Sequence, residues 1–147
     1  PDGVTQIRVR LCGGGGGGGV SRGNGSSNIQ NGHAGGTSSF GHYATATGGS
    51  GGTFMGAAGA GGSGSGLQIS VSGSNGTKGY AYCSDMPFPY GCGGACYNEG
   101  NGGGAGGYTC GILDIASGEN IVVTIGAAGW ALESASYGKP GCCIVEW

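Results

Sequence analysis

The sequence predicts an all-β protein in which short β-strands alternate with irregular glycine-rich segments. Glycine supplies 42 of the 147 residues, against an average usage of about 7 %, and this density disfavours long helices. Several short segments alternate apolar and polar residues with the period of two that is typical of half-buried strands. Only 8 % of the residues are charged and the net charge is −2, which argues against a disordered chain. The length predicts a single domain over residues 1–147.

The alternation is clearest near the start of the chain. There Ile7, Val9 and Leu11 fall on one face, and Arg8 and Arg10 fall on the other. Similar segments rich in β-branched residues occur later, and β-branched side chains favour strands. The predicted strands are residues 5–11, 67–71, 121–125 and 143–147, with 112–115 as a candidate fifth.

Three glycine-rich segments separate the predicted strands: residues 13–19, 48–66 and 100–107. One interpretation is that they are flexible linkers. The alternative is that they form polyglycine II-type helices with three residues per turn, which pack laterally and bond each N–H to a carbonyl of a neighbouring segment. We expect the packed arrangement, because the segments lie between strands and cysteines and their other residues are mostly Ala, Ser and Thr.

Seven cysteines stand in a chain that has few large apolar residues. A small core needs additional stabilisation, and disulfides commonly provide it in oxidising, extracellular surroundings. We therefore expect disulfide staples, with one thiol left over or paired between chains because the count is odd. The candidates are Cys12, Cys83, Cys92, Cys96, Cys110, Cys142 and Cys143.

A zinc site is the alternative use of these cysteines. Cys92 and Cys96 have a spacing close to that of zinc ligands, and the adjacent pair Cys142 and Cys143 would complete four sulfurs. Zinc ligand pairs usually follow a C-x2-C spacing, which neither pair has. We therefore expect no metal and no cofactor.

Composition and motifs disfavour several classes of function. The five Lys and Arg residues form no cluster, so nucleic-acid binding is not expected, and no apolar run approaches the ~18 residues of a membrane-spanning helix. His33 and His42 lie among Gly, Ser and Thr, without a G-x-S-x-G elbow or paired carboxylates. We expect both histidines to be solvated loop residues and the protein not to be an enzyme.

The candidate binding residues are aromatic, because such side chains offer a large contact area and sugars stack on their rings. One group lies in or beside a proline-stiffened stretch between cysteines, and the second is a His-Tyr pair between two glycine-rich segments. The alternative is that these rings only cap a small core. The candidates are Phe88, Tyr90 and Tyr97 in the first group, and His42 and Tyr43 in the second.

Four motifs occur in a fixed order along the chain. A strand ending in Val-Arg-Leu-Cys runs into the seven glycines of segment 13–19, and Gly-Gly-Gly-Ala-Gly-Gly-Tyr follows at 102–108. Ser-Gly-Glu-Asn-Ile-Val-Val-Thr-Ile-Gly-Ala-Ala-Gly stands at 117–129, and Gly-Lys-Pro-Gly-Cys-Cys-Ile-Val-Glu-Trp stands at 138–147. This order, which covers nearly the whole chain, resembles the glycine-rich domain at the C-terminal tips of bacteriophage tail fibres.

The resemblance implies an extracellular, non-enzymatic tail-fibre or adhesin domain of the virion. Its implied partners are further copies of the same chain, as a homotrimer, and a bacterial surface glycan or outer-membrane protein. Two other functions stay open, namely a subunit of a self-assembling extracellular filament and, more remotely, a glycine-rich antifreeze-like protein. Because the chain opens at Pro1 without Met, we expect a processed protein or a piece of a longer one.

Overall fold

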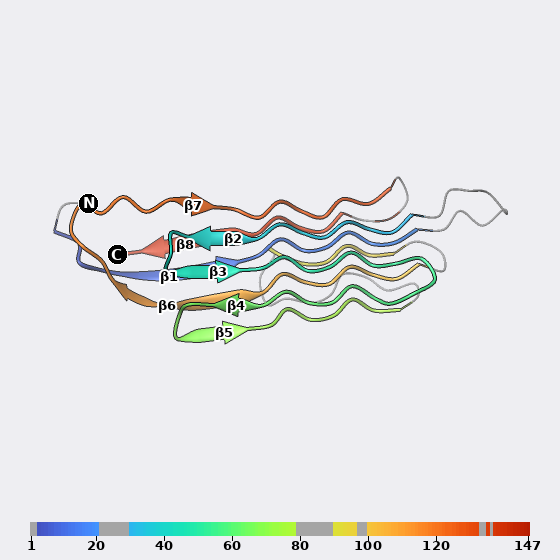
Figure 1. Ribbon diagram of the computed structural model, residues 1–147, viewed down its shortest axis with the longest axis horizontal. Helices are drawn as coiled ribbons and strands as arrows, with labels where there is room; N and C mark the ends of the chain where they lie inside the picture. Colours follow the sequence, from blue (N-terminus) through green and yellow to red (C-terminus); the bar gives the residue numbers. More distant parts are fainter. Residues whose placement is uncertain (1–2, 21–29, 79–89, 97–99, 133–134, 136) are drawn as a thin grey trace.

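The computed structural model describes residues 3–20, 30–78, 90–96, 100–132, 135 and 137–147. These residues contain eight β-strands and no helix, which confirms the all-β prediction. The strands form two four-stranded antiparallel sheets, in the orders β5-β6-β1-β8 and β4-β3-β2-β7. In Figure 1 they gather in one half of an elongated molecule, which we call the strand end. Their bounds are β1 Gln6–Cys12, β2 Ser38–Phe40, β3 Ala44–Ala46, β4 Gly64–Ser65, β5 Ile69–Val71, β6 Tyr108–Asp114, β7 Val123–Thr124 and β8 Cys142–Glu146.

The apolar core lies between the two sheets of the strand end. Ile7, Val9 and Leu11 of β1 are buried and pack with Phe40 of β2 and with the alanines of β3. Every second side chain of β1 therefore faces the core, as a strand with one buried face requires. This confirms the alternation seen at the start of the chain.

Strand boundaries differ from the sequence prediction most at β6, which begins at Tyr108 and not at residue 112. β6 pairs with all seven residues of β1, from Gln6 opposite Asp114 to Cys12 opposite Tyr108. Its length is therefore set by its partner strand and not by its own apolar residues. The sequence pattern does not predict β2, β3 or β4, since these strands consist mostly of Ser, Ala, Thr and Gly.

Extended segments run on from the strands and form the rest of the described chain, which we call the glycine-rich body (Figure 1). Most of their residues belong to neither a helix nor a strand. Segment 13–19 bonds to several neighbours at once, because consecutive N–H groups donate to different segments. Gly13, Gly14 and Gly15 donate in turn to the carbonyls of Gly107, Gly36 and Lys139, at 2.8–2.9 Å.

This bonding pattern repeats after three residues. The Gly16 N–H returns to the segment that Gly13 bonds, at the carbonyl of Gly104, and the Gly17 N–H returns to the segment that Gly14 bonds, at the carbonyl of His33. The carbonyls of segment 13–19 accept N–H groups from further segments. Among the described residues, the neighbours bonded to segment 13–19 are 33–36, 48–52, 91–94, 101–107, 126–130 and 138–141. Such lateral bonds distinguish a packed segment from a free linker, whose polar groups bond water.

The packing leaves no room for side chains at inward positions. A Cβ built on Gly16 would overlap the carbonyl oxygen of Ser50, and one built on Gly103 would overlap that of Gly16. Both obstacles are backbone atoms, which cannot rotate away as the end of a side chain can. Glycine is required at these positions by the close approach of neighbouring chains.

The structure does not show the predicted disulfide staples among the residues it describes. No disulfide joins two cysteines within the described ranges, which contain Cys12, Cys92, Cys96, Cys110, Cys142 and Cys143; Cys83 lies outside them. On the first sheet, Cys12 and Cys142 oppose each other as thiols. The prediction assumed that a small core needs cross-links, whereas in the structure the lateral backbone hydrogen bonds of the glycine-rich body join distant parts of the chain.

Candidate aromatic binding surface

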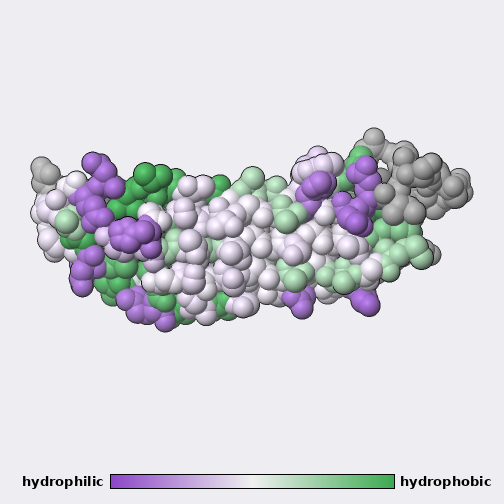
Figure 2. Space-filling model, in the orientation of Figure 1, coloured by the Kyte–Doolittle hydropathy of each residue, from purple (hydrophilic) through white to green (hydrophobic). Residues whose placement is uncertain are grey.

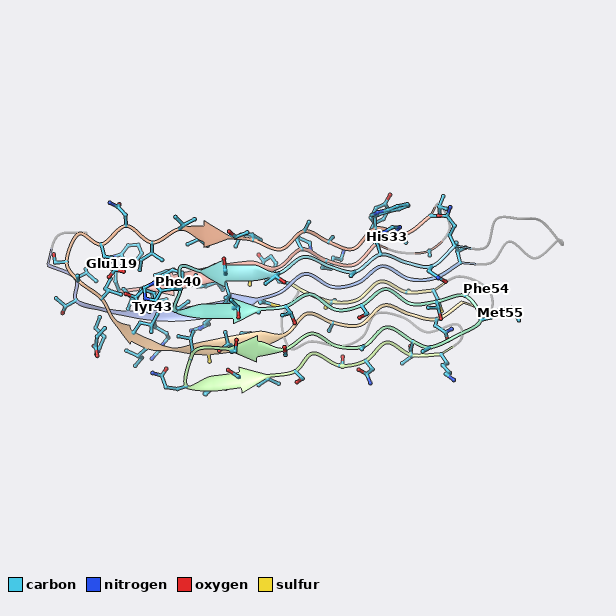
Figure 3. All side chains as sticks on the ribbon, in the orientation of Figure 1. His33, Phe40, Tyr43, Phe54, Met55 and Glu119 are labelled. Atoms are coloured by element: carbon cyan, nitrogen blue, oxygen red, sulfur yellow. The ribbon has the colours of Figure 1, made fainter. Side chains whose placement is uncertain are left out.

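An exposed pair of aromatic rings lies on the glycine-rich body. The rings of His33 and Trp130 stack with their centroids 4.0 Å apart and their planes 14° from parallel. Trp130 nevertheless keeps 45 % of its surface exposed, so the imidazole covers only part of the indole. Figure 3 shows His33 well away from Phe40 and Tyr43, which belong to the strand end.

Backbone hydrogen bonds hold the two stacked residues in place. The His33 N–H donates to the Trp130 carbonyl at 2.9 Å, and the His33 carbonyl accepts from the Gly17 N–H at 2.8 Å. A further bond from the Gly36 N–H to the Ala127 carbonyl makes the two segments run side by side in opposite directions. The stack thus results from lateral packing of segments that are far apart in the sequence.

A third aromatic residue lies on the next segment. The Gly138 N–H donates to the Gly129 carbonyl at 2.9 Å. This bond places the backbone of Tyr137 next to the backbone of Trp130. Tyr137 is 60 % exposed. We call His33, Trp130 and Tyr137 the aromatic patch.

The aromatic patch combines flat apolar ring faces with polar ring edges. The indole N–H and the tyrosine hydroxyl can donate hydrogen bonds, and the hydroxyl and an imidazole nitrogen can accept them. The neighbouring residues Ala34, Ala127 and Gly129 are too small to cover the rings. Such a surface suits a ligand with one flat apolar face and hydrogen-bonding groups around its rim.

The predicted pair His42 and Tyr43 lies at the turn between β2 and β3. Their ring centroids are 4.0 Å apart with planes tilted by 34°. The Tyr43 hydroxyl donates to Glu119 Oε1 at 2.8 Å, and this hydrogen bond raises the pKa of Tyr43 above its ordinary value. Tyr43 is partly buried against the core, so it contributes to packing as well as to the surface.

The remaining predicted residues do not join this pair. Tyr90 is exposed, and its carbonyl accepts a hydrogen bond from the Cys12 thiol at 3.7 Å, near the end of β1. Ser38, at the opposite end of β2 from the His42–Tyr43 turn, bonds the Cys12 carbonyl, so Tyr90 and Tyr43 lie at opposite ends of that strand. Phe88 and Tyr97 lie outside the described residues.

Sequence reasoning missed Trp130 and Tyr137. Both follow short runs of small residues, and neither belongs to an apolar pattern. The prediction that His33 is a solvated loop residue agrees with its exposure but not with its stacked ring. Nothing local pairs His33 with Trp130, since their contact depends on which segments pack together.

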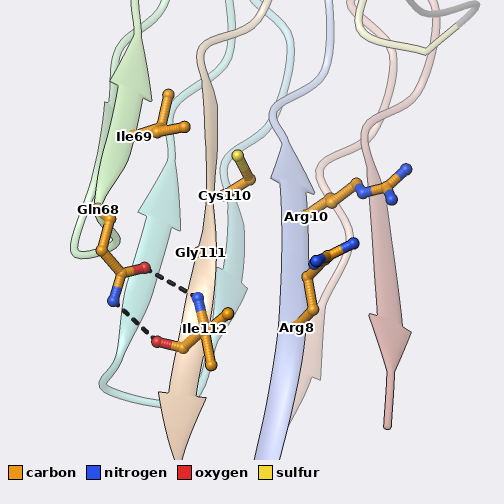
Figure 4. A pocket seen from close by; sticks show the side chains of 7 residues that line it. All are labelled: Arg8, Arg10, Gln68, Ile69, Cys110, Gly111 and Ile112. Atoms are coloured by element: carbon orange, nitrogen blue, oxygen red, sulfur yellow. Dashed lines mark hydrogen bonds between the residues drawn. The ribbon is translucent and has the colours of Figure 1, made fainter.

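A groove of about 410 Å³ crosses the outer face of the first sheet (Figure 4). The Gln68 side-chain amide forms part of it by donating to the Ile112 carbonyl at 2.8 Å and accepting from the Ile112 N–H at 2.9 Å. Arg10 is paired with Glu146 at 2.9 Å. The groove can take an apolar group of a ligand beside the arginine side chains of β1. Its lining residues are Arg8, Arg10, Gln68, Ile69, Cys110, Gly111 and Ile112.

Three thiols of the first sheet, those of Cys12, Cys142 and Cys143, are poorly suited to nucleophilic chemistry. Burial raises the pKa of Cys12 to about 12, and burial also raises the pKa values of Cys142 and Cys143. The thiolate is the reactive form of cysteine, and a raised pKa depletes it at neutral pH.

Two further findings concern the described part of the chain. No group of three or more His, Cys, Asp or Glu side chains is placed there to hold a metal ion. The same residues include no helix with the length and apolar character needed to cross a membrane.

Comparison of the chain with protein-family models, with curated proteins and with solved structures finds no match. The resemblance to tail-fibre tip domains therefore rests on the four sequence motifs alone.

Proposed function

We propose that this chain is a non-enzymatic receptor-binding domain of the bacteriophage tail-fibre kind, which acts on the outside of the virion and attaches to a bacterial surface glycan or outer-membrane protein. The main support for the proposal is the exposed stack of His33 and Trp130, which lies on a backbone held by lateral hydrogen bonds. Exposed aromatic side chains on a rigid support are typical of recognition surfaces. The order of the four motifs supports the assignment to tail fibres.

We also infer that the glycine-rich segments are polyglycine II-type helices. In a helix with three residues per turn, consecutive N–H groups point in three different directions, and the direction recurs every third residue. The bonding of Gly13 and Gly16 to one neighbour, and of Gly14 and Gly17 to another, has this period. No residue of segment 13–19 has the positive φ that marks left-handed turns.

Rigidity matters to this function because binding is weakened by the ordering of flexible groups. Trp130 and His33 are held both by their mutual stack and by their backbone bonds to each other and to Gly17. A receptor therefore meets rings that are already in place. The lateral packing supports recognition by fixing the position of the aromatic patch.

The proposed function is tested by binding of the fluorescently labelled chain to a panel of bacterial strains. We expect attachment to at least one strain, and at least a tenfold loss of attachment in Trp130→Ala. Val122→Ala is the matched control, since Val122 is 76 % exposed and lies in no candidate site. Failure to attach to any strain of a broad panel would contradict the proposal.

The second candidate function, a filament subunit, is favoured by the outer face of the first sheet. Ile69, Ile112 and Ile144 are exposed there, and β5 and β8 form the edges of that sheet. Exposed apolar patches and open edges favour association of chains. Sedimentation velocity separates the two: a closed trimer favours the fibre tip, and an open polymer that Ile112→Ser dissociates favours the filament.

A further inference from the structure

The His33–Trp130 stack leaves a defined part of the indole available to a ligand. With centroids 4.0 Å apart and planes 14° from parallel, the imidazole covers one face of the indole. Trp130 keeps 45 % of its surface exposed, so part of the indole stays open to a ligand. Stacking also restricts the rotation of both side chains, so the indole has a fixed direction.

The surroundings of the stack are small and almost uncharged. The segments 32–36, 126–130 and 137–141 contain no acidic side chain, and their only Lys or Arg is Lys139. Apart from the aromatic patch, their residues are Gly, Ala, Pro and that lysine. Apart from the aromatic patch, Pro140 and Lys139, these described segments therefore offer no side chain large enough to enclose the exposed part of the indole.

This shape decides between a protein and a sugar as the ligand. Protein hot spots usually lie in desolvated pockets ringed by further contacts, which neighbours as small as Ala127 and Gly129 do not provide. A pyranose ring is small enough to be held by one indole, and its C–H face is apolar while its hydroxyl groups lie at the rim. The polar edges of His33, Trp130 and Tyr137 match that rim.

We propose that the aromatic patch is a saccharide-binding site whose ligand is a pyranose unit of a cell-surface glycan, an inference that rests on the proposed receptor-binding function. Trp130 stacks on the C–H face of the sugar. His33 orients the indole and hydrogen-bonds a hydroxyl group, and the Tyr137 hydroxyl bonds a second sugar unit or a second hydroxyl. Lys139, two residues beyond Tyr137, offers the only cation of these segments.

The experiment uses the intact chain and a panel of soluble oligosaccharides: cellotetraose, maltotetraose and the tetramer of N-acetylglucosamine. Binding is followed by saturation-transfer difference NMR and by isothermal titration. We expect at least one of these sugars to bind, with its ring C–H protons receiving the strongest transfer. Trp130→Ala should weaken that binding at least tenfold, and Tyr137→Phe, which removes only the hydroxyl, should weaken it two- to fivefold.

Trp147→Ala is the matched control, because Trp147 is the second tryptophan, is 74 % exposed and lies next to β8 at the strand end. It should bind the sugars as the parent does. Thermal melting of each variant checks the fold, and because Trp130 is exposed, its variant should melt within a few degrees of the parent.

Failure of the saccharide site and failure of the proposed tail-fibre function give different results in these experiments. Equal sugar binding by the parent and Trp130→Ala overturns the saccharide site. Loss of cell attachment in Trp130→Ala without binding of any sugar also overturns it, and leaves a receptor-binding domain that contacts protein. Sugar binding through Trp130 in a chain that attaches to no bacterial strain supports the saccharide site and overturns the tail-fibre function.

Discussion

The strand end and the glycine-rich body of this protein are stabilised by different parts of the chain. In the strand end, side chains such as Val9, Leu11 and Phe40 are buried between two sheets, and removal of apolar surface from water stabilises the fold. In the glycine-rich body few side chains are available, and backbone N–H and C=O groups of neighbouring segments bond to one another. In Figure 2 strongly apolar and polar residues gather at the strand end on the left, whereas the middle of the glycine-rich body is pale.

The two regions should respond to opposite kinds of substitution. The strand end is weakened when atoms are removed from a packed core, because a cavity is left. The glycine-rich body is weakened when atoms are added, because neighbouring backbones already touch.

Adding a side chain at the centre of the glycine-rich body should abolish folding. Overpacking a side-chain core typically costs about 1–3 kcal/mol, and in Gly103→Val the obstacle is the Gly16 carbonyl, a backbone group, so we expect a larger loss. Circular dichroism and soluble yield measure it. Gly102→Ala is the matched control, since a Cβ there meets nothing closer than 3.4 Å. Equal melting of the two variants would show that the segments do not pack as described.

Removing atoms from the core of the strand end should cost less but remain large. Leu11 is fully buried, and Leu→Ala changes at buried sites cost about 2–5 kcal/mol. We expect Leu11→Ala to lower the free energy of unfolding in urea by that amount. Val122→Ala, at an exposed position, should change it by less than about 0.5 kcal/mol. If both variants unfold at the same urea concentration, the core between the sheets is not the stabilising element of this region.

Alkaline pH should destabilise the folded protein through Cys12, which lies where β1 meets segment 13–19. Burial raises the pKa of Cys12 from 9.0 to about 12. At pH values between these two, the thiol stays protonated in the folded protein, whereas the thiol of the unfolded chain ionises. The unfolded state then binds fewer protons, and stability falls as pH rises through that window. The raised pKa values of Cys142, Cys143 and Tyr108 act in the same direction.

The measurement is the urea midpoint at pH 7, 8 and 10.5. We expect little change between the first two values and a clear drop at the third. Cys12→Ala should show a smaller drop than the parent, because it removes the thiol that is most strongly shifted. An identical drop in both proteins would assign the alkaline effect to other groups.

The smallest effect is expected at the surface of the strand end. Arg10 and Glu146 form an ion pair at 2.9 Å and are both substantially exposed. Exposed pairs contribute about 0–1 kcal/mol, so Glu146→Gln should lower the free energy of unfolding by less than about 1 kcal/mol. A double-mutant cycle with Arg10→Gln isolates the pair, and a coupling above that limit would place the ion pair among the main stabilising contacts.

The all-β class and the inward face of β1 could be predicted from the sequence because both depend on local patterns. Alternation of Ile7, Val9 and Leu11 with arginines has one arrangement that buries the apolar set and exposes the charges. The density of glycine likewise excludes long helices by backbone entropy alone. The expectation of laterally packed segments also followed from composition, since glycine lets backbones approach closely.

Features that depend on partner segments could not be predicted. β6 extends to Tyr108 because it pairs with all of β1, although its own first residues carry no strand pattern. Cys12 and Cys142, predicted to form disulfides, are thiols that the first sheet sets opposite each other. Composition indicated that the glycine-rich segments can pack laterally, but it did not indicate which segments bond to one another.

The buried face of β1 and the close approach of the glycine-rich segments both follow from side-chain size and spacing along one segment, so local sequence is enough to predict them. The neighbours of residues 13–19, and therefore the contact between His33 and Trp130, depend on the whole fold. Glycine segments bond through backbone groups that are alike at every residue, so no local pattern marks which segments become neighbours. The position of the aromatic patch depends on that choice of neighbours.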